Sequence, residues 1–321
     1  MRILVTGGAG FIGSCFVKTI LKERPSYEVF NMDKLTYAGN LENLSEIQPS
    51  SKYHFVQADI ADFEKAKNVV EKFQLDAIIN FAAESHVDRS IQDSSAFIHT
   101  NIQGTHSLLE LARIYKIKRF VQVSTDEVYG SLEEGGYFTE NTSLAPNSPY
   151  AASKASADLL VRSYFKTYKL PLLISRCSNN YGPYQYPEKL IPLFIIRALQ
   201  NQELPLYGDG LYVRDWIHVQ DHCLALLAIL EKGKEGEVYN VGARCERKNI
   251  YIAHKILSLL GRPKTLLRSV QDRLGHDRRY AIDPSKIEKE LSWKPKFQLD
   301  DDLSSLIEWY KNHEAWWRKL S

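Results

Sequence analysis

Val5-Thr6-Gly7-Gly8-Ala9-Gly10-Phe11-Ile12-Gly13 joins a short apolar run at residues 2–6 to an amphipathic stretch at residues 11–24. A strand, a glycine-rich turn and a helix in this order are typical of a dinucleotide-binding fold. Glycines permit the tight turn and let backbone N–H groups approach a pyrophosphate. The N-terminus of the helix then faces the anion. The glycines at 8, 10 and 13 meet the G-x-G-x-x-G pattern, so the stretch predicts a nucleotide cofactor site.

Strand and helix patterns continue to alternate through the first half of the chain. Further strands are expected at residues 28–32, 53–57, 77–81, 120–124 and 172–176. Helical patterns at 62–73, 97–115 and 150–168 separate most of them. Such alternation predicts an α/β fold, a Rossmann-type doubly wound parallel sheet with helices on both faces.

The order changes after about residue 176, where prolines and a Gly208-Asp209-Gly210 turn interrupt the chain. Helices are expected at 189–200, 218–232, 249–260 and 302–318. We therefore expect a NAD-binding domain at 1–176 and a smaller mixed α/β domain, mainly for substrate, at 177–321. A helix and a strand near 215–242 are expected to return to the first domain.

Bulk composition excludes several classes of protein. With 41 basic and 39 acidic residues the net charge is +2, which gives no reason to expect nucleic acid or a membrane surface as partner. No apolar run approaches the roughly 20 residues that span a bilayer. The four cysteines are widely spaced and form no metal-ligand pair, so we expect no metal and a cytoplasmic protein with reduced thiols.

Asp33 ends the second expected strand, about 20 residues after the glycine turn. A carboxylate there accepts hydrogen bonds from the adenosine ribose and repels a 2′-phosphate, which favours NAD over NADP. The neighbouring Lys34 keeps NADP open as an alternative. Asp59-Ile60 is expected beside the adenine, and the stretch from Phe81 to His86 beside the nicotinamide ribose.

Tyr150 and Lys154 are one helical turn apart and project from one face of a helix. An ammonium group beside a phenol favours the phenolate, so Lys154 is expected to lower the pKa of Tyr150. Tyrosine then becomes a usable base for a sugar hydroxyl. The strand at 120–124 precedes this helix and runs into Ser124-Thr125-Asp126-Glu127, which is expected to open into the same crevice.

These motifs resemble the extended short-chain dehydrogenase/reductases, and among them the dTDP-glucose 4,6-dehydratase family. The resemblance covers nearly the whole chain. Its segments are Asp33-Lys-Leu-Thr-Tyr-Ala-Gly-Asn40, Ala82-Ala-Glu-Ser-His-Val-Asp-Arg-Ser90, Ser124-Thr-Asp-Glu-Val-Tyr-Gly130, Ser178-Asn-Asn-Tyr-Gly-Pro183, Pro187-Glu-Lys-Leu-Ile-Pro192 and Asp277-Arg-Arg-Tyr280.

The resemblance implies a lyase that dehydrates dTDP-glucose to dTDP-4-keto-6-deoxyglucose through C4 oxidation by NAD, elimination across C5 and C6, and reduction of C6. Tyr150 removes the C4 hydroxyl proton, Thr125 bonds the developing keto oxygen, Glu127 removes the C5 proton, and Asp126 protonates the departing hydroxyl. Opposite protonation states require environments that push the two carboxyl pKa values apart. A nucleotide-sugar 4-epimerase, a decarboxylase or another 4,6-dehydratase is the alternative, and a non-catalytic NAD-binding protein is a second.

The resemblance also implies the ligand contacts. Cofactor contacts are expected from Gly7, Gly10, Phe11, Ile12, Gly13, Asp33, Lys34, Leu35, Thr36, Asp59, Ile60, Phe81, Ala82, Ala83, Glu84, Ser85, Thr100, Tyr150, Lys154 and Asn180. Substrate contacts are expected from Ser85, Thr125, Asn179, Lys189, Leu190, Pro205, Leu206, Tyr207, Arg214, Asn249, Arg273 and His276. The arginines suit bidentate phosphate binding.

A homodimer is expected from the helices at 97–115 and 150–168, because each has more apolar residues than one sheet-facing stripe requires. The surplus residues are Ile102, Leu108, Leu109, Leu159, Val161 and Phe165. Relatives pair such helices into a four-helix interface. The resemblance further implies deoxysugar biosynthesis, with rhamnose as a common product.

Overall fold

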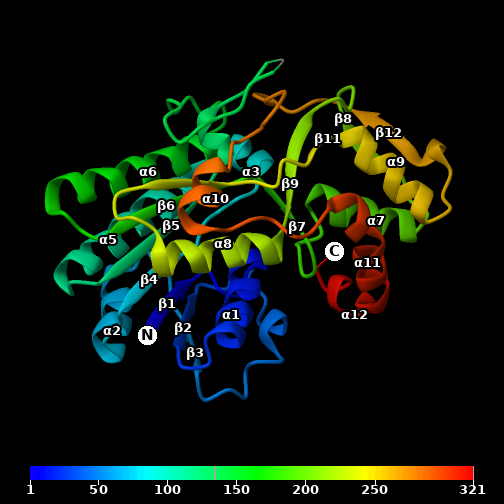
Figure 1. Ribbon diagram of the computed structural model, residues 1–321. Coiled ribbons are helices and arrows are strands. Elements are labelled where there is room, and N and C mark those ends of the chain that lie inside the picture. The colour runs from blue at the N-terminus through cyan, green and yellow to red at the C-terminus, as the bar shows by residue number, and fades with distance from the viewer. Residues whose placement is uncertain (134, 321) are drawn as a thin grey trace.

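A seven-stranded parallel sheet forms the centre of the larger region (Figure 1). The structure, a computed structural model, describes residues 1–133 and 135–320. In spatial order the strands are β10 (Val238–Val241), β6 (Leu172–Cys177), β5 (Arg119–Thr125), β4 (Ala77–Asn80), β1 (Arg2–Thr6), β2 (Glu28–Asp33) and β3 (Tyr53–Gln57). The doubly wound α/β fold is confirmed. The strand order reverses at β1, the point at which such sheets bind ligands.

Alternation along the buried strands builds a core on each face of the sheet. Ile3 and Val5 of β1 face one side, while Leu4 between them faces the other. The first core is covered by α1 (Phe11–Glu23), α8 (Val219–Lys232) and α10 (Ser285–Leu291). The second is covered by α2 (Phe63–Phe73), α5 (Thr105–Ile114) and α6 (Pro149–Tyr168). Both helical layers follow because every strand is apolar on two faces.

The expected helix at 97–115 is divided into three parts. The short helix α4 (Ser95–Phe97) leads into a π-helical segment, η2 (Ile98–Gly104), before α5 begins. Asn101 in this segment exchanges two hydrogen bonds with the backbone of Glu84, and its amide also donates to Ser153 Oγ at 2.8 Å. A local π-turn therefore aims an amide inward, and π-turns are frequent at functional sites.

Chain segments after residue 176 contribute to both regions. Helix α8 packs against α1, and β10 pairs in parallel with β6 at the edge of the main sheet. The smaller region contains one sheet of β7 (Asn179–Tyr181), β9 (Val213–His218) and β11 (Glu246–Lys248), and another of β8 (Leu204–Tyr207) and β12 (Leu267–Val270). Helices α7 (Leu190–Leu199) and α9 (Asn249–Leu259) cover these sheets.

The chain ends in two helices rather than one. Helix α11 (Leu299–Asn312) stops at His313, and α12 (Glu314–Trp317) follows, so the expected helix at 302–318 begins earlier and is broken. Residue 321, the end of the expected second domain, lies outside the described residues. Within the described ranges, no helix is long and apolar enough to cross a membrane.

Candidate active site

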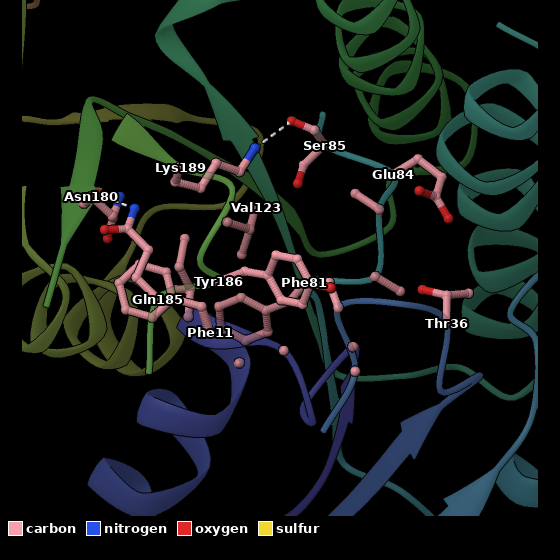
Figure 2. A pocket seen from close by; sticks show the side chains of 18 of the residues that line it. Phe11, Thr36, Phe81, Glu84, Ser85, Val123, Asn180, Gln185, Tyr186 and Lys189 are labelled. Carbon is pink, nitrogen blue, oxygen red and sulfur yellow. Dashed lines mark hydrogen bonds between the residues drawn. The ribbon is translucent and has the colours of Figure 1, made fainter. Parts of the chain in front are cut away.

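One cavity, of about 360 Å³, lies where β1, β2, β4, β5 and β6 end. The glycine turn, the segment after β4, the ends of β5 and β6, and the start of α6 all line it. Figure 2 shows the cavity, with Phe11 and Phe81 at its centre and Lys189 reaching from the smaller region to the carbonyl of Ser85, a hydrogen bond of 3.0 Å. Of the expected cofactor contacts, all except Leu35 line this cavity. The Leu35 N–H instead donates to Asp33 Oδ1 at 2.8 Å.

The glycine turn leaves no room for a side chain at Gly7, Gly8 or Gly13. Gly7 has a φ of +70°, and a Cβ there would lie 2.6 Å from the backbone nitrogen of Ala82. A Cβ on Gly13 would lie 2.2 Å from the Gly7 oxygen, because α1 begins directly against the turn. The turn and the first residues of α1 therefore form a cradle of backbone groups that fits a pyrophosphate.

Asp33 is held by this same turn. Its Oδ2 accepts from the N–H of Ala9 at 2.9 Å, and its side chain is only 8% exposed at the cavity edge. Burial raises the pKa of Asp33, and the backbone hydrogen bonds from Leu35 and Ala9 oppose this rise. The carboxylate keeps lone pairs free for a ribose hydroxyl, which is the role that the sequence predicts.

Lys154 does not act on Tyr150 as the motif spacing led us to expect. The Lys154 ammonium, 4% exposed, donates to the Val123 carbonyl at 2.7 Å. Burial and the nearby charge of Glu127 raise the pKa of Tyr150 well above its ordinary value, while a hydrogen bond with Thr125 opposes the rise. The expected lowering of the Tyr150 pKa by Lys154 is therefore wrong, because desolvation of the phenol is the largest effect.

Asp126 and Glu127 begin a single 3₁₀ turn directly after β5. Asp126 is 1% exposed, and among the described residues its Oδ2 has no hydrogen-bond partner. Burial, Glu127 and Asp215 raise the pKa of Asp126 well above its ordinary value. Burial also raises the pKa of half-buried Glu127, but Arg214, Lys189 and Arg273 oppose that rise. Burial therefore raises both pKa values, but the three cations make Glu127 the more readily ionised of the two carboxyl groups.

The expected substrate contacts fall into two groups. Ser85, Thr125, Asn179, Lys189 and Leu190 line the cavity. The others lie outside its lining, in the smaller region and the loop after β12: Pro205, Leu206, Tyr207, Arg214, Asn249, Arg273 and His276.

Several of these residues hold unused polar atoms. Among the described residues, Oδ1 of Asn179, Oδ1 of Asn249 and Nε of Arg273 are buried without a hydrogen-bond partner. Leu206 packs its side chain into the core of the smaller region, so its backbone is the part that remains for a ligand. His276 stacks on the Tyr212 ring and bonds to Asp272, which fixes its position.

Sequence reasoning missed part of the cavity wall. Trp316 from the chain end lines it, and the Trp316 indole N–H donates to Asn43 Oδ1 at 2.9 Å. His222 on α8 is fully buried and bonds to Asn180 Oδ1 at 2.9 Å, and burial lowers its pKa to about 3. No local pattern marks these residues. Tyr37 also lines the cavity. It belongs to the motif at residues 33–40, so its place in the site could have been predicted from the sequence.

Comparisons with known proteins agree with this geometry. Residues 4–306 match the family described as GDP-mannose 4,6 dehydratase. A dTDP-glucose 4,6-dehydratase of Xanthomonas campestris pv. campestris (strain B100) is 49% identical over 98% of this chain and 94% of its own length. Solved dTDP-glucose 4,6-dehydratases with NAD bound are DesIV from Streptomyces venezuelae (TM-score 0.97, 48% identity) and that of Bacillus anthracis str. Ames (TM-score 0.94, 51% identity). Both alignments cover all of each chain. The chain belongs to the GDP-mannose 4,6 dehydratase family and, within it, to the dTDP-glucose 4,6-dehydratases.

Proposed function

We propose that this protein is an NAD-dependent hydro-lyase that converts dTDP-glucose to dTDP-4-keto-6-deoxyglucose and water. The observation that carries the proposal is the pair Asp126 and Glu127, which follow one strand into the cavity that Tyr150 also lines. An epimerase needs no acid for a leaving hydroxyl, whereas an elimination needs an acid and a base on adjacent carbons.

The residues divide the elimination between them. Glu127, whose pKa Arg214, Lys189 and Arg273 lower against the effect of burial, acts as the carboxylate that takes the proton from C5. Asp126, whose pKa burial raises well above its ordinary value, acts as the acid that gives its proton to the C6 hydroxyl as it leaves. Thr125 lies at the start of the same turn, and its hydroxyl bonds the developing C4 keto oxygen.

Tyr150 takes the C4 hydroxyl proton as a phenolate. Burial raises its pKa and so opposes that form, and a positive charge bound nearby would lower the pKa and favour it. The backbone cradle at Gly7–Gly13 would hold NAD, which would supply a hydride acceptor for C4, a hydride donor for C6 and, when oxidised, a positive charge near Tyr150. Lys154 contributes a buried ammonium fixed on the Val123 carbonyl, which positions it to bond the nicotinamide ribose. The overall cycle is redox neutral.

A panel of nucleotide sugars tests this function. Purified protein is incubated with dTDP-glucose, UDP-glucose and GDP-mannose, and products are measured by mass and by the alkaline absorbance of 4-keto sugars. We expect loss of one water from dTDP-glucose. A C4 epimer of unchanged mass, or no product from any sugar, would contradict the proposal.

Cofactor preference follows from Asp33. We expect the wild-type protein to bind NAD more tightly than NADP, because the carboxylate repels a 2′-phosphate. Asp33→Ala should narrow the ratio of the two dissociation constants by about fivefold or more, because two unit charges 4 Å apart interact by about 1 kcal/mol even in water. Calorimetry with both cofactors measures this ratio. If the substitution disturbs the glycine turn, both dissociation constants change together and their ratio is unaffected. Equal affinities in the wild-type protein would refute the assignment.

We further propose that residues 1–176, with a return segment near 215–242, bind NAD, and that residues 177–321 mainly bind the nucleotide sugar. Support comes from the cavity lining, which joins the glycine turn and residues 81–85 after β4 to Asn179, Asn180 and several residues between 184 and 190. Use of the product in deoxysugar synthesis such as that of rhamnose, in the cytoplasm, is part of the proposal. The four cysteines are all free, which suits a reducing compartment.

A homodimer through η2, α5 and α6 is also proposed. Leu108, Leu109 and Val161 are buried in the protein's own core, so these three expected surface residues are unavailable. Leu159, which is among the expected residues, is exposed at 55%, and Ile98 at 53%, Ile114 at 49% and Tyr168 at 49% are exposed as well. These residues present apolar surface to a second copy.

Light scattering at micromolar concentration should therefore give the mass of a dimer. Leu159→Glu places a charge within the apolar surface and should shift the protein to a monomer. Leu259→Glu, at the exposed end of α9, is the matched control and should remain dimeric. A monomeric wild-type protein would overturn the proposal.

A further inference from the structure

The short helix α3 (Val87–Gln92) brings a carboxylate to residues of the smaller region. Asp88 Oδ1 lies 3.2 Å from Nε of Arg273, and Asp88 Oδ2 accepts from the Tyr207 hydroxyl at 3.2 Å. The Arg273 guanidinium also lies over the Tyr207 ring, 4.7 Å from its centroid. Asp88 thus contacts Tyr207 and Arg273, two residues that the family resemblance implies as substrate contacts.

Arg273 differs from the other two cations near Glu127. Arg214 donates to the backbone carbonyl of Asp277 at 2.9 Å, and Lys189 donates to that of Ser85 at 3.0 Å. Arg273 faces the Asp88 carboxylate instead, and the two groups lie close together without the alignment that a hydrogen bond requires. Its Nε is buried and makes no hydrogen bond within the described part of the chain. The guanidinium therefore keeps hydrogen-bonding capacity for another anion.

We propose that the Asp88 carboxylate pairs with Arg273 when no substrate is bound, and that the diphosphate of the substrate displaces it. This inference rests on the proposed function, with Arg273 as the arginine that binds the diphosphate of the nucleotide sugar. A phosphate satisfies the guanidinium fork with aligned, charge-assisted hydrogen bonds, which the carboxylate does not achieve here. The Asp88 side chain is 27% exposed, so it can turn to water without burying an unpaired charge.

Displacement has a definite consequence for binding. The diphosphate must compete with a charge already present, so Asp88 weakens binding of substrate and product alike and speeds product release. A purely structural ion pair between helix α3 and the smaller region predicts the opposite sign. In that case the loss of Asp88 leaves Arg273 misplaced, and nucleotide affinity falls or stays the same.

Calorimetry with dTDP on the NAD-loaded protein separates the two roles. Asp88→Asn keeps the side-chain size and removes the charge, so the dissociation constant should fall about 1.5- to 5-fold, the effect of an exposed ion pair. Release of dTDP, followed by stopped flow, should slow in proportion. The matched control is Glu203→Gln, which removes a carboxylate that pairs with Arg268 at 2.5 Å on the same region, and it should change neither value.

A double variant shows whether the gain in dTDP affinity depends on Arg273. In an Arg273→Gln background, adding Asp88→Asn should give no gain in dTDP affinity, because the competition no longer exists. Unchanged or weaker binding by Asp88→Asn, or a gain that persists without Arg273, overturns the inference. Turnover of dTDP-glucose by the wild-type protein is measured on the same preparation. Turnover without tighter binding by Asp88→Asn removes the role of Asp88 alone, whereas absence of turnover removes the proposed function and this inference with it.

Discussion

Asp126→Asn should stop the reaction after oxidation of C4. The amide keeps the size of the carboxyl group but has no acid proton to give to the C6 hydroxyl. Loss of a general acid slows the step by about 10²- to 10⁴-fold. Tyr150, Lys154 and the cofactor cradle are unchanged, so C4 oxidation should survive. Mixing this variant with dTDP-glucose should therefore produce a lasting rise in the absorbance of reduced nicotinamide.

Glu127→Gln provides the matched comparison, because it changes the neighbouring carboxyl group in the same way. This variant should also fail to release water, but its defect lies at C5. Exchange of the C5 hydrogen with solvent, measured by mass spectrometry, should fall sharply in Glu127→Gln. Wild-type turnover by Asp126→Asn would show that Asp126 only caps the turn after β5, and the epimerase alternative would then regain support.

Arg176→Met should strongly destabilise the fold. Arg176 on β6 donates to Asp158 Oδ2 on α6 at 2.9 Å, and their side chains are 6% and 1% exposed. Removing the guanidinium leaves a buried carboxylate without its counter-charge, which costs about 3–5 kcal/mol. Urea unfolding at pH 8 measures the loss. The control Arg318→Met breaks an exposed pair with Glu314 and should cost about 0–1 kcal/mol.

The pH dependence of this loss has a definite sign. Burial raises the pKa of Asp158 above 3.8, and the Arg176 charge opposes that rise. Without Arg176 the folded-state pKa rises further, so the folded protein binds the proton more tightly than the unfolded chain does. A protonated Asp158 needs no counter-ion, and its contribution to stability is lost as the pH rises. The deficit of Arg176→Met should therefore shrink between pH 8 and pH 5, and a deficit that grows would contradict this account.

Local chemistry was sufficient for the fold and for much of the candidate site. The turn after β1 requires glycine because neighbouring backbone atoms lie too close for a Cβ. This requirement involves only a few consecutive residues, so it can be recognised from the sequence. Tyr150 and Lys154 project together because they are one helical turn apart, and Asp126 and Glu127 are adjacent. Spacings of this kind involve only residues close together in the sequence, so they can be recognised without a structure. All four side chains line the cavity described above.

The tertiary structure decided how those groups behave. Whether Asp126 is neutral depends on burial and on Asp215, and whether Glu127 is ionised depends on arginines that the chain supplies much later. Desolvation likewise reversed the expected shift of the Tyr150 pKa. Charge states follow from the dielectric surroundings and from distances between remote segments, and neither is contained in a local pattern.

Contacts between distant segments were also beyond the sequence. Trp316 bonds to Asn43 across 273 residues of chain, and Asp88 on α3 meets Arg273 in the loop after β12. Each residue alone resembles an ordinary polar or aromatic surface residue, and only packing of the smaller region against the Rossmann sheet brings the partners together. The sequence by itself determined the sheet and the cofactor cradle, and it supplied the candidates for the acid, the base and the tyrosine. The protonation states of these residues and the pairing of Arg273 with Asp88 were decided by the tertiary structure, because both depend on which distant charges are buried together.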